Sequence, residues 1–298
     1  MSFGVQIRDL GVRYGRTEAL TRVDLDLEAG LIHGLLGRNG SGKTTLLSTI
    51  AAFRRPSAGT VLVDGEIPWE NTHVMAGTCL VRESGDVQAE VSMKDNLAFV
   101  AGARPHFDPE LAGRLLDVFE LDPRRRPSKL SRGKKSAFGA VVGLASRAEL
   151  TIFDEVYLGM DAPSRYAFYD ALIEDYVEHP RTIILSSHLI DEIQRLLESV
   201  VILDAGRVLL AEDADTLRGR GVSVTGPADA VDTFTADRVV LRRRGLGRTA
   251  EVTVDGGLTP AERATAAGLG LELGPVDLQS LFVHLTEKSH PTEKEAAR

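Results

Sequence analysis

One segment combines small, basic and hydroxyl residues at a spacing that suits phosphate chemistry. Residues 37–45 read GRNGSGKTT and fit the pattern G-x-x-x-x-G-K-[ST] completely. Glycines let backbone N–H groups turn inward around phosphate oxygens, whereas a Cβ would obstruct that turn. Lys43 supplies a charge for the β- and γ-phosphates, and the Thr44 hydroxyl is a ligand for Mg²⁺. The segment predicts a nucleoside triphosphate site made by Gly37, Arg38, Asn39, Gly40, Ser41, Gly42, Lys43, Thr44 and Thr45.

An acidic pair follows a second apolar run. Residues 151–155 read TIFDE, a short buried strand that ends in two carboxylates about 110 residues after the glycine-rich segment. Taken alone, this is also the pattern of an ordinary strand with a solvated end. Phosphoryl transfer, however, needs a ligand for Mg²⁺ and a group that orients the attacking water. Combined with residues 37–45, the pair predicts that Asp154 binds the metal and that Glu155 polarises the water.

The elements that must position these groups alternate between strand and helix. The apolar run 31–37 reads as a buried strand that feeds the glycine-rich turn, and residues 41–53 have helical spacing. Strand and helix patterns alternate again over 150–210, where one helix is expected over 189–199. This alternation predicts a layered α/β domain with parallel strand pairing.

The stretch from about 84 to 140 predicts a helical subdomain. Ser92, with Asp95 three residues on, is a helix-start signal, and the pair Asp108-Pro109 is another. We expect its helices over 92–103, 109–121 and 131–145.

Composition and charge exclude several classes of protein. The 298 residues carry 35 basic and 43 acidic side chains, a net charge of −8, which argues against bulk nucleic-acid binding. Cys79 is the only cysteine, so no intrachain disulfide forms, and we expect it to be buried. No apolar run reaches the roughly 18 residues of a membrane span, and residues 1–10 lack a signal-peptide pattern. We therefore expect a cytoplasmic chain, whose membrane span, if needed, another chain supplies.

Residues 130–134, LSRGK, make the combined pattern specific. With the two segments above, they resemble the nucleotide-binding subunit of ABC transporters, and the motifs occur in the family's order over residues 1 to about 215. The resemblance implies a P-loop NTPase of ABC type, in which Ser131 and Gly133 reach across a dimer to the γ-phosphate of the partner's ATP. Arg132 and Lys134 depart from the common form LSGGQ, and they add positive charge near phosphate.

Further motifs follow from the same resemblance. Gly159-Met160-Asp161 resembles the loop after the catalytic glutamate, although Val156 replaces the usual proline. His188, at the end of TIILSSH, resembles the switch histidine, which contacts the γ-phosphate or holds water with Glu155.

Two assignments depend most on the resemblance. Tyr14 matches the aromatic residue that stacks on adenine. The family also places a glutamine at a metal-binding position after a strand. Glu83 is the better match to it, as a carboxylate that ligates Mg²⁺ or orients water, and Gln88 is the alternative.

These patterns together predict the domain organisation. We expect an ABC ATPase domain over 1–217, with a β-subdomain and a mixed or parallel α/β core, and a small α+β domain over 218–287. The second domain is expected to run strand, helix, two strands, helix, strand, helix. Residues 288–298 are polar and are expected to be a disordered tail.

The resemblance implies the function. We expect an ATP-hydrolysing subunit that couples closure and opening of a homodimer or heterodimer to export by a separate membrane permease. Such a protein lies at the inner face of the cell membrane through its permease, and no nucleic-acid partner is expected. One alternative is a soluble ABC-type ATPase of translation or repair, although such proteins usually carry two cassettes, coiled coils or zinc-binding cysteines. A non-hydrolysing nucleotide sensor is the other alternative, and Glu155 and His188 argue against it.

Overall fold

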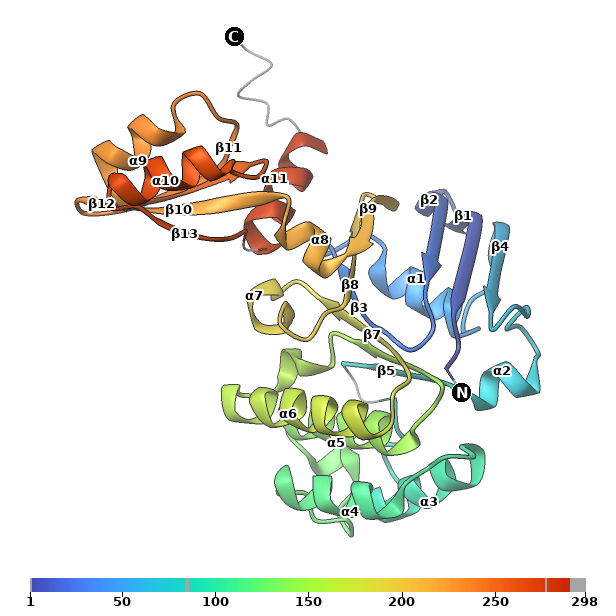
Figure 1. Ribbon diagram of the computed structural model, residues 1–298. Coiled ribbons are helices and arrows are strands. Elements are labelled where there is room, and N and C mark those ends of the chain that lie inside the picture. The colour runs from blue at the N-terminus through green and yellow to red at the C-terminus, as the bar shows by residue number, and fades with distance from the viewer. Residues whose placement is uncertain (1, 84–85, 277, 290–298) are drawn as a thin grey trace. The chain divides into compact units, whose positions relative to one another are not determined.

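The computed structural model describes residues 2–83, 86–276 and 278–289, and the chain divides into two compact units. The first unit comprises Met1–His188 and Arg195–Ala211, and the second comprises Leu189–Gln194 and Glu212–Arg298. Each unit is built on its own β-sheet structure (Figure 1). Within the described ranges, no helix has both the length and the apolar character needed to cross a membrane.

A six-stranded sheet forms the centre of the first unit, in the order β5-β6-β7-β3-β8-β9. The strands are β3 (Ile32–Leu36), β5 (Thr78–Arg82), β6 (Leu150–Asp154), β7 (Thr182–Ser187), β8 (Ser199–Asp204) and β9 (Arg207–Asp213). The pairs β5–β6, β6–β7, β7–β3 and β3–β8 are parallel, which confirms the expected pairing. Their register places Leu36 beside Ser187 and Asp154 beside Ser186. Segments that follow different strands therefore emerge at one edge of the sheet.

A second, antiparallel sheet of the same unit has the order β2-β1-β4. It consists of β1 (Val5–Tyr14), β2 (Thr17–Leu27) and β4 (Ala58–Val63). Helix α1 (Lys43–Ile50) buries Leu46, Leu47 and Ile50 in a core that also contains apolar residues of both sheets. The helix that begins at Lys43 is thus fixed between two sheets (Figure 1).

The helical region of the first unit follows the predicted starts. The Ser92 hydroxyl accepts a hydrogen bond from Asp95 N at 3.2 Å, and Asp108 caps the next helix with Pro109 at its first position. Besides α1, the helices of this unit are α2 (Thr72–Ala76), α3 (Met93–Ala103), α4 (Pro109–Val118), α5 (Arg132–Ser146) and α6 (Ala162–Glu178), with short 3₁₀ turns at η1 (Pro127–Lys129) and η2 (Val156–Gly159). The described helices confirm the three expected ones to within a few residues. Cys79 is buried in β5, as expected.

The helix expected over 189–199 is wrong for most of its length. Helix α7 covers only Ile190–Ile193. The expected helix stops there because Gln194 makes other contacts within the second unit. Its backbone O accepts a hydrogen bond from Arg218, and its Oε1 accepts one from Leu278 N. Tertiary contacts override the apolar periodicity here.

From β10 on, the second unit has the expected order of elements, and helix α8 precedes them. Its elements are α8 (Ala214–Arg218), β10 (Gly221–Pro227), α9 (Ala228–Thr235), β11 (Val240–Leu246), β12 (Thr249–Asp255), α10 (Pro260–Gly268), β13 (Glu272–Pro275) and α11 (Leu278–Ser289). The four strands form an antiparallel sheet in the order β11-β12-β10-β13, the arrangement of a ferredoxin-like βαββαβ unit. Val222, Val224, Val252 and Val254 belong to its core. The expected tail begins in the last residues of α11, and residues 290–298 lie outside the described part.

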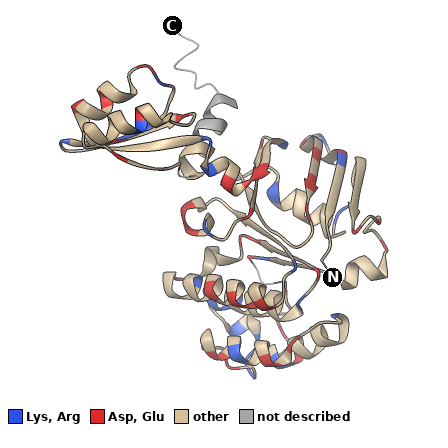
Figure 2. Ribbon diagram, in the orientation of Figure 1, with Lys and Arg blue, Asp and Glu red and all other residues tan. Residues whose placement is uncertain are grey.

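Charged side chains of both signs are interspersed along the helices and strands of each unit (Figure 2). Many of them form ion pairs on the surface, such as Arg8 with Asp26 and Arg243 with Asp232. Exposed pairs of this kind contribute little to stability.

Candidate functional site

The loop of residues 37–45 joins β3 to α1, as the sequence predicts. Gly40 and Gly42 have φ angles of 82° and 108°, which side chains strongly disfavour. A Cβ on Gly37 would lie 2.5 Å from Leu203 O, so the backbone at Leu203 leaves no room for a side chain at position 37. The Ser41 hydroxyl is buried and has no hydrogen-bond partner among the described residues. The loop is thus a tight backbone cradle at a helix N-terminus, which is the arrangement that binds phosphate.

Lys43 is held within this cradle. Its side chain is only 6% exposed, and its Nζ donates hydrogen bonds to Gly37 O at 2.8 Å and to Arg38 O at 3.3 Å. The same Nζ lies 3.1 Å from Glu155 Oε1. A buried ammonium is costly unless it is paired, and these contacts supply its partners. These contacts also keep the Lys43 ammonium beside the backbone of the phosphate-binding loop.

Asp154 is the last residue of β6 and is only 4% exposed. Its carboxylate accepts a hydrogen bond from the hydroxyl of Ser186, the residue beside it in the register of β7. The same hydroxyl accepts a hydrogen bond from Glu155 N at 3.1 Å. Ser186 therefore fixes both acidic residues, although no sequence pattern singles it out without the strand register.

Glu155 links the cradle to the end of β7. Its backbone is left-handed, with φ of 52°, an uncommon conformation that turns the chain sharply out of the strand. Its Oε1 lies 3.1 Å from Lys43 Nζ and 3.4 Å from His188 Nδ1. The predicted catalytic residues therefore come together: one carboxylate oxygen lies between the lysine and the histidine.

Ser131 is the N-cap residue of α5, and its side chain accepts a hydrogen bond from Lys134 N at 3.3 Å. Gly133 lies against η2: a Cβ there would be 2.5 Å from Gly159 O. Glycine is required at position 133 because the helix start packs directly on the backbone of the loop that follows Glu155. Asp161, further along that loop, caps α6 through Ser164 N at 3.0 Å. Hydrogen bonds from Ser164 lower the pKa of the Asp161 carboxyl.

The two candidates for the metal-binding position after β5 have different surroundings. The Glu83 carboxylate forms an ion pair with Arg132, and its backbone oxygen accepts a hydrogen bond from Ser136 Oγ at 3.0 Å. Gln88 exchanges backbone hydrogen bonds with the side chain of Asn96. Glu83 thus lies one residue beyond a strand of the parallel sheet and contacts the helix that Ser131 begins.

The donors of the site fit the groups that the sequence implies. Magnesium is commonly held by one or two carboxylates and by the phosphates of its substrate. Asp154 supplies a carboxylate and Thr44 an exposed hydroxyl at the start of α1. Among the described residues, no cluster of three or more His, Cys, Asp or Glu forms a complete metal cage. This small donor set suits a metal that arrives with a nucleotide.

Tyr14 ends β1 in the β1–β2 hairpin, opposite Thr17. Its side chain is 47% exposed although it is aromatic, and the guanidinium carbon of Arg54 lies 3.7 Å from the ring centroid. Sequence reasoning did not identify Arg54. The signal that could have done so is its place just after α1, close in sequence to the phosphate-binding loop.

Comparison with known proteins places these features in a family. Residues 20–157 match the family model described as ABC transporter. The chain is 30% identical over 240 residues to the daunorubicin resistance ATP-binding protein DrrA3 of Streptomyces coeruleorubidus, covering 78% of this chain and 72% of that protein. It is 27% identical over 220 residues to the ABC transporter ATP-binding protein YtrB of Bacillus subtilis, covering 74% and 75%.

Another relative is named as an import protein. The methionine import ATP-binding protein MetN 1 of Burkholderia lata is 30% identical over 223 residues, covering 69% of this chain and 64% of that protein. A solved structure of the ATP-binding subunit of an ABC transporter superposes with a TM-score of 0.64 and 25% identity, over 72% of this chain and 91% of that one. Sequence and fold therefore agree on the family.

Proposed function

Because this chain belongs to the ABC transporter family of ATP-binding subunits, we propose that its ATPase site consists of residues 37–45, Asp154, Glu155 and His188. The chain is an ABC transporter ATPase. One observation carries the residue assignment. The Oε1 atom of Glu155 lies within 3.5 Å of both Lys43 Nζ and His188 Nδ1, beside the phosphate-binding loop. This arrangement supports Glu155 as the group that orients water.

Each residue has a distinct role in the proposed reaction. The backbone of residues 37–45 and the Lys43 ammonium bind the phosphates of ATP. Thr44 and Asp154 would hold Mg²⁺, which would supply charge stabilisation to the phosphates. Lys43 must then exchange its contacts with Gly37 O and Glu155 for phosphate oxygens. Glu155, released from the lysine, accepts a hydrogen bond from the attacking water, and His188 helps to orient that water. Glu83 would have to leave its ion pair with Arg132 before its carboxylate could help to hold the metal.

We propose that a second subunit completes the site. Ser131 and Gly133 present a hydroxyl and backbone N–H groups at the start of a 15-residue helix, which suits an anion. Gly133 packs against η2 of its own chain, which connects the start of α5 to the loop of Asp161. In a head-to-tail pair, Ser131 and Gly133 of one subunit close over the γ-phosphate bound by the other, with Asp161 beside them. ATP stabilises the closed pair because only that state makes both sets of contacts.

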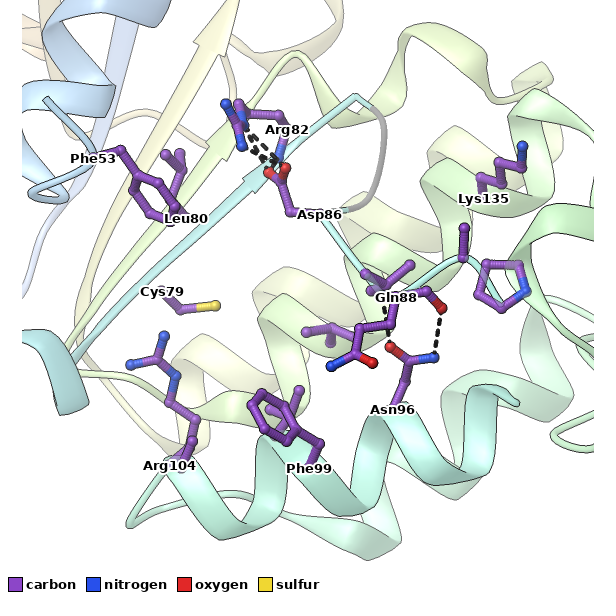
Figure 3. Close-up of a pocket in the computed structure, with 16 residues that line it drawn as sticks. Phe53, Cys79, Leu80, Arg82, Asp86, Gln88, Asn96, Phe99, Arg104 and Lys135 are labelled. Atoms are coloured by element: carbon purple, nitrogen blue, oxygen red, sulfur yellow. Dashed lines mark hydrogen bonds and ion pairs between the residues drawn. The ribbon is translucent and has the colours of Figure 1, made fainter. Parts of the chain in front are cut away.

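A groove of about 740 Å³ in the first unit supports a membrane partner (Figure 3). It lies between β5 and the helices α3 and α5, and the exposed rings of Phe53 and Phe99 line it. Arg82 and Asp86 neutralise each other there, whereas Arg104 and Lys135 leave a positive balance. We propose that a short segment of a separate permease docks in this groove through an apolar side chain and a carboxylate.

The functional divisions of the chain are also proposals. Residues 1–217 form the ATPase domain, with the helical subdomain at about 84–140, and residues 218–287 form an accessory domain. The ATPase domain lies at the inner face of the membrane through its permease. Export is favoured by the LSRGK segment and by the resistance protein among the relatives, although an import protein is equally similar in sequence.

Steady-state ATP hydrolysis by the purified chain tests the proposed site. Glu155→Gln keeps the size of the side chain but removes its basicity, so we expect turnover to fall at least about 100-fold while ATP still binds. Glu174→Gln, at an exposed position of α6, is the matched control and should hydrolyse ATP normally. The catalytic assignment is wrong if Glu155→Gln and wild type turn over equally, alone or with the permease.

The same preparation separates the transporter from a soluble ATPase. A permease-coupled subunit should copurify with a membrane protein from detergent extracts of its own cells. Copurification with ribosomes or DNA repair proteins instead would favour the soluble alternative.

A further inference from the structure

The aromatic ring proposed to stack on the nucleobase has one face already covered. Arg54 lies over Tyr14 with its guanidinium carbon 3.7 Å from the ring centroid, which is a close cation–π distance. Arg54 Nη2 also donates a hydrogen bond to Arg13 O at 2.6 Å, so the guanidinium is anchored to the strand that carries the ring. The tyrosine remains 47% exposed. The Arg54 guanidinium therefore covers one face of the Tyr14 ring, and the exposed surface of Tyr14 lies elsewhere on the ring.

The backbone around Arg54 is fixed by several hydrogen bonds. Arg54 N donates to Ser48 O in the last turns of α1 at 3.1 Å. Three residues on, Ser57 N donates to Gly11 O at 2.8 Å, and Ser57 Oγ accepts from Arg13 N at 3.0 Å. These bonds tie the segment after α1 to β1. The guanidinium is thus held in place by both elements, so stacking on Tyr14 needs little further ordering.

The direction from which Arg54 approaches matters. Arg54 follows the C-terminal end of α1, whereas the phosphate-binding loop lies at its N-terminal end. A helix of eight residues is about 12 Å long, so the guanidinium belongs to the end of the helix away from the phosphates. A direct role for Arg54 in binding phosphate is therefore not favoured.

We propose that Arg54 is a positioning residue for the nucleobase: it covers one face of Tyr14 and leaves the opposite face for a purine. This inference rests on the proposed role of Tyr14. The bound state is then a three-layer stack of guanidinium, phenol ring and base. Arg54 fixes the ring's orientation and prevents the base from stacking on the wrong side. Stacking reads no base edge, so the platform accepts adenine and guanine alike.

The neighbouring residue provides a matched control. Arg55 has the same charge and also stacks on an aromatic ring, but the ring is Trp69, at 4.3 Å, and its guanidinium pairs with Glu70. Substituting Arg55 changes net charge and surface stacking as Arg54 does, without touching Tyr14.

Binding of MgATP, MgGTP and inorganic tripolyphosphate to the full chain, measured by calorimetry, tests the proposal. We expect Arg54→Ala to raise the Kd for ATP and GTP by the same factor, about two- to fivefold, as loss of an exposed cation–π contact implies. Tyr14→Ala should raise it roughly 5- to 150-fold. Arg55→Ala should change neither, and no variant should change tripolyphosphate binding, which also shows that the phosphate-binding loop remains folded.

The double variant separates the two proposals. Tyr14→Ala with Arg54→Ala should bind ATP no more weakly than Tyr14→Ala alone, because Arg54 acts through the ring. If Tyr14→Ala binds ATP with unchanged affinity, Tyr14 does not stack on the base, and the inference about Arg54 is wrong as well. A weakened Tyr14→Ala variant beside an unchanged or tighter Arg54→Ala variant would refute the inference alone. Equal losses for ATP and tripolyphosphate in Arg54→Ala would refute it too, by assigning Arg54 to the phosphates.

Discussion

Ser186 is the residue whose removal most sharply tests how the metal is held. Its hydroxyl is fully buried, donates to the Asp154 carboxylate, and accepts from Glu155 N. Ser186→Ala leaves a buried carboxylate oxygen and a buried N–H group without these partners. Losing a hydrogen bond to a charged group costs about 1.5–3 kcal/mol, so the free energy of unfolding should fall by an amount in that range.

The effect on metal use should be larger than an effect on packing alone. Residues that orient a metal ligand typically account for a 10- to 100-fold change in metal affinity or activity. We therefore expect Ser186→Ala to raise the Mg²⁺ concentration for half-maximal ATP hydrolysis about tenfold or more. Magnesium titrations of ATPase turnover at saturating ATP measure this, and urea unfolding measures stability separately.

Ser187→Ala is the matched control for this prediction. Ser187 is equally buried, one residue further along β7, and accepts a hydrogen bond from the Tyr157 hydroxyl at 2.7 Å. Its removal should lower stability without changing the half-maximal Mg²⁺ concentration. If both variants keep the wild-type Mg²⁺ dependence, or both shift it equally, Ser186 does not orient a metal ligand and the role of Asp154 must be reconsidered.

Three further predictions concern other parts of the chain. Gly133→Ala places a Cβ 2.5 Å from Gly159 O, so it should lower the free energy of unfolding in urea by about 1–3 kcal/mol. It should also reduce ATP turnover more than ATP affinity. A variant with wild-type turnover would show that this close contact is not needed for activity. Hydrogen bonds, chiefly with the Thr259 hydroxyl, lower the pKa of Glu262 to about 2. Because the pKa is depressed in the folded state, the stability that this cap contributes is present above about pH 4.5 and is lost as the pH falls toward 2. The Tm of Glu262→Gln should therefore be lower than that of wild type at pH 6 and equal to it near pH 2, and a Tm difference that stays constant with pH would refute this. Phe99→Ala removes an exposed ring of the groove and should reduce copurification of the permease while basal ATPase stays unchanged; undiminished copurification would argue against docking there.

Much of the site could be predicted because its chemistry lies in contiguous motifs. Asp154 ends a short apolar strand, Lys43 and His188 come after such strands, and parallel pairing brings the carboxyl ends of these strands to one edge. The expected order of strands and helices after residue 218 also matches the structure, since each element there is bounded by clear turn residues. Local pattern and global fold agree in these segments.

What could not be predicted depends on contacts between distant segments. Ser186 matters only because the register sets it beside Asp154, and no local pattern reports a register between residues 32 positions apart. Arg54 acquires its place by stacking on a ring 40 residues earlier in the chain. The helix expected over 189–199 ends at Ile193 because Gln194 bonds to residues of the second unit.

The central claim is that each ATP site is built from two subunits, and a mixing experiment tests it most directly. Lys43→Ala should disable the phosphate-binding loop, and Ser131→Arg should disable the helix start offered to the partner, so each variant alone should be inactive. In a 1:1 mixture, random pairing makes half of the dimers mixed, and each mixed dimer has one intact site, so turnover should recover to about a quarter of wild type. Full activity of Ser131→Arg alone, or a mixture no more active than its two components, would contradict a shared site.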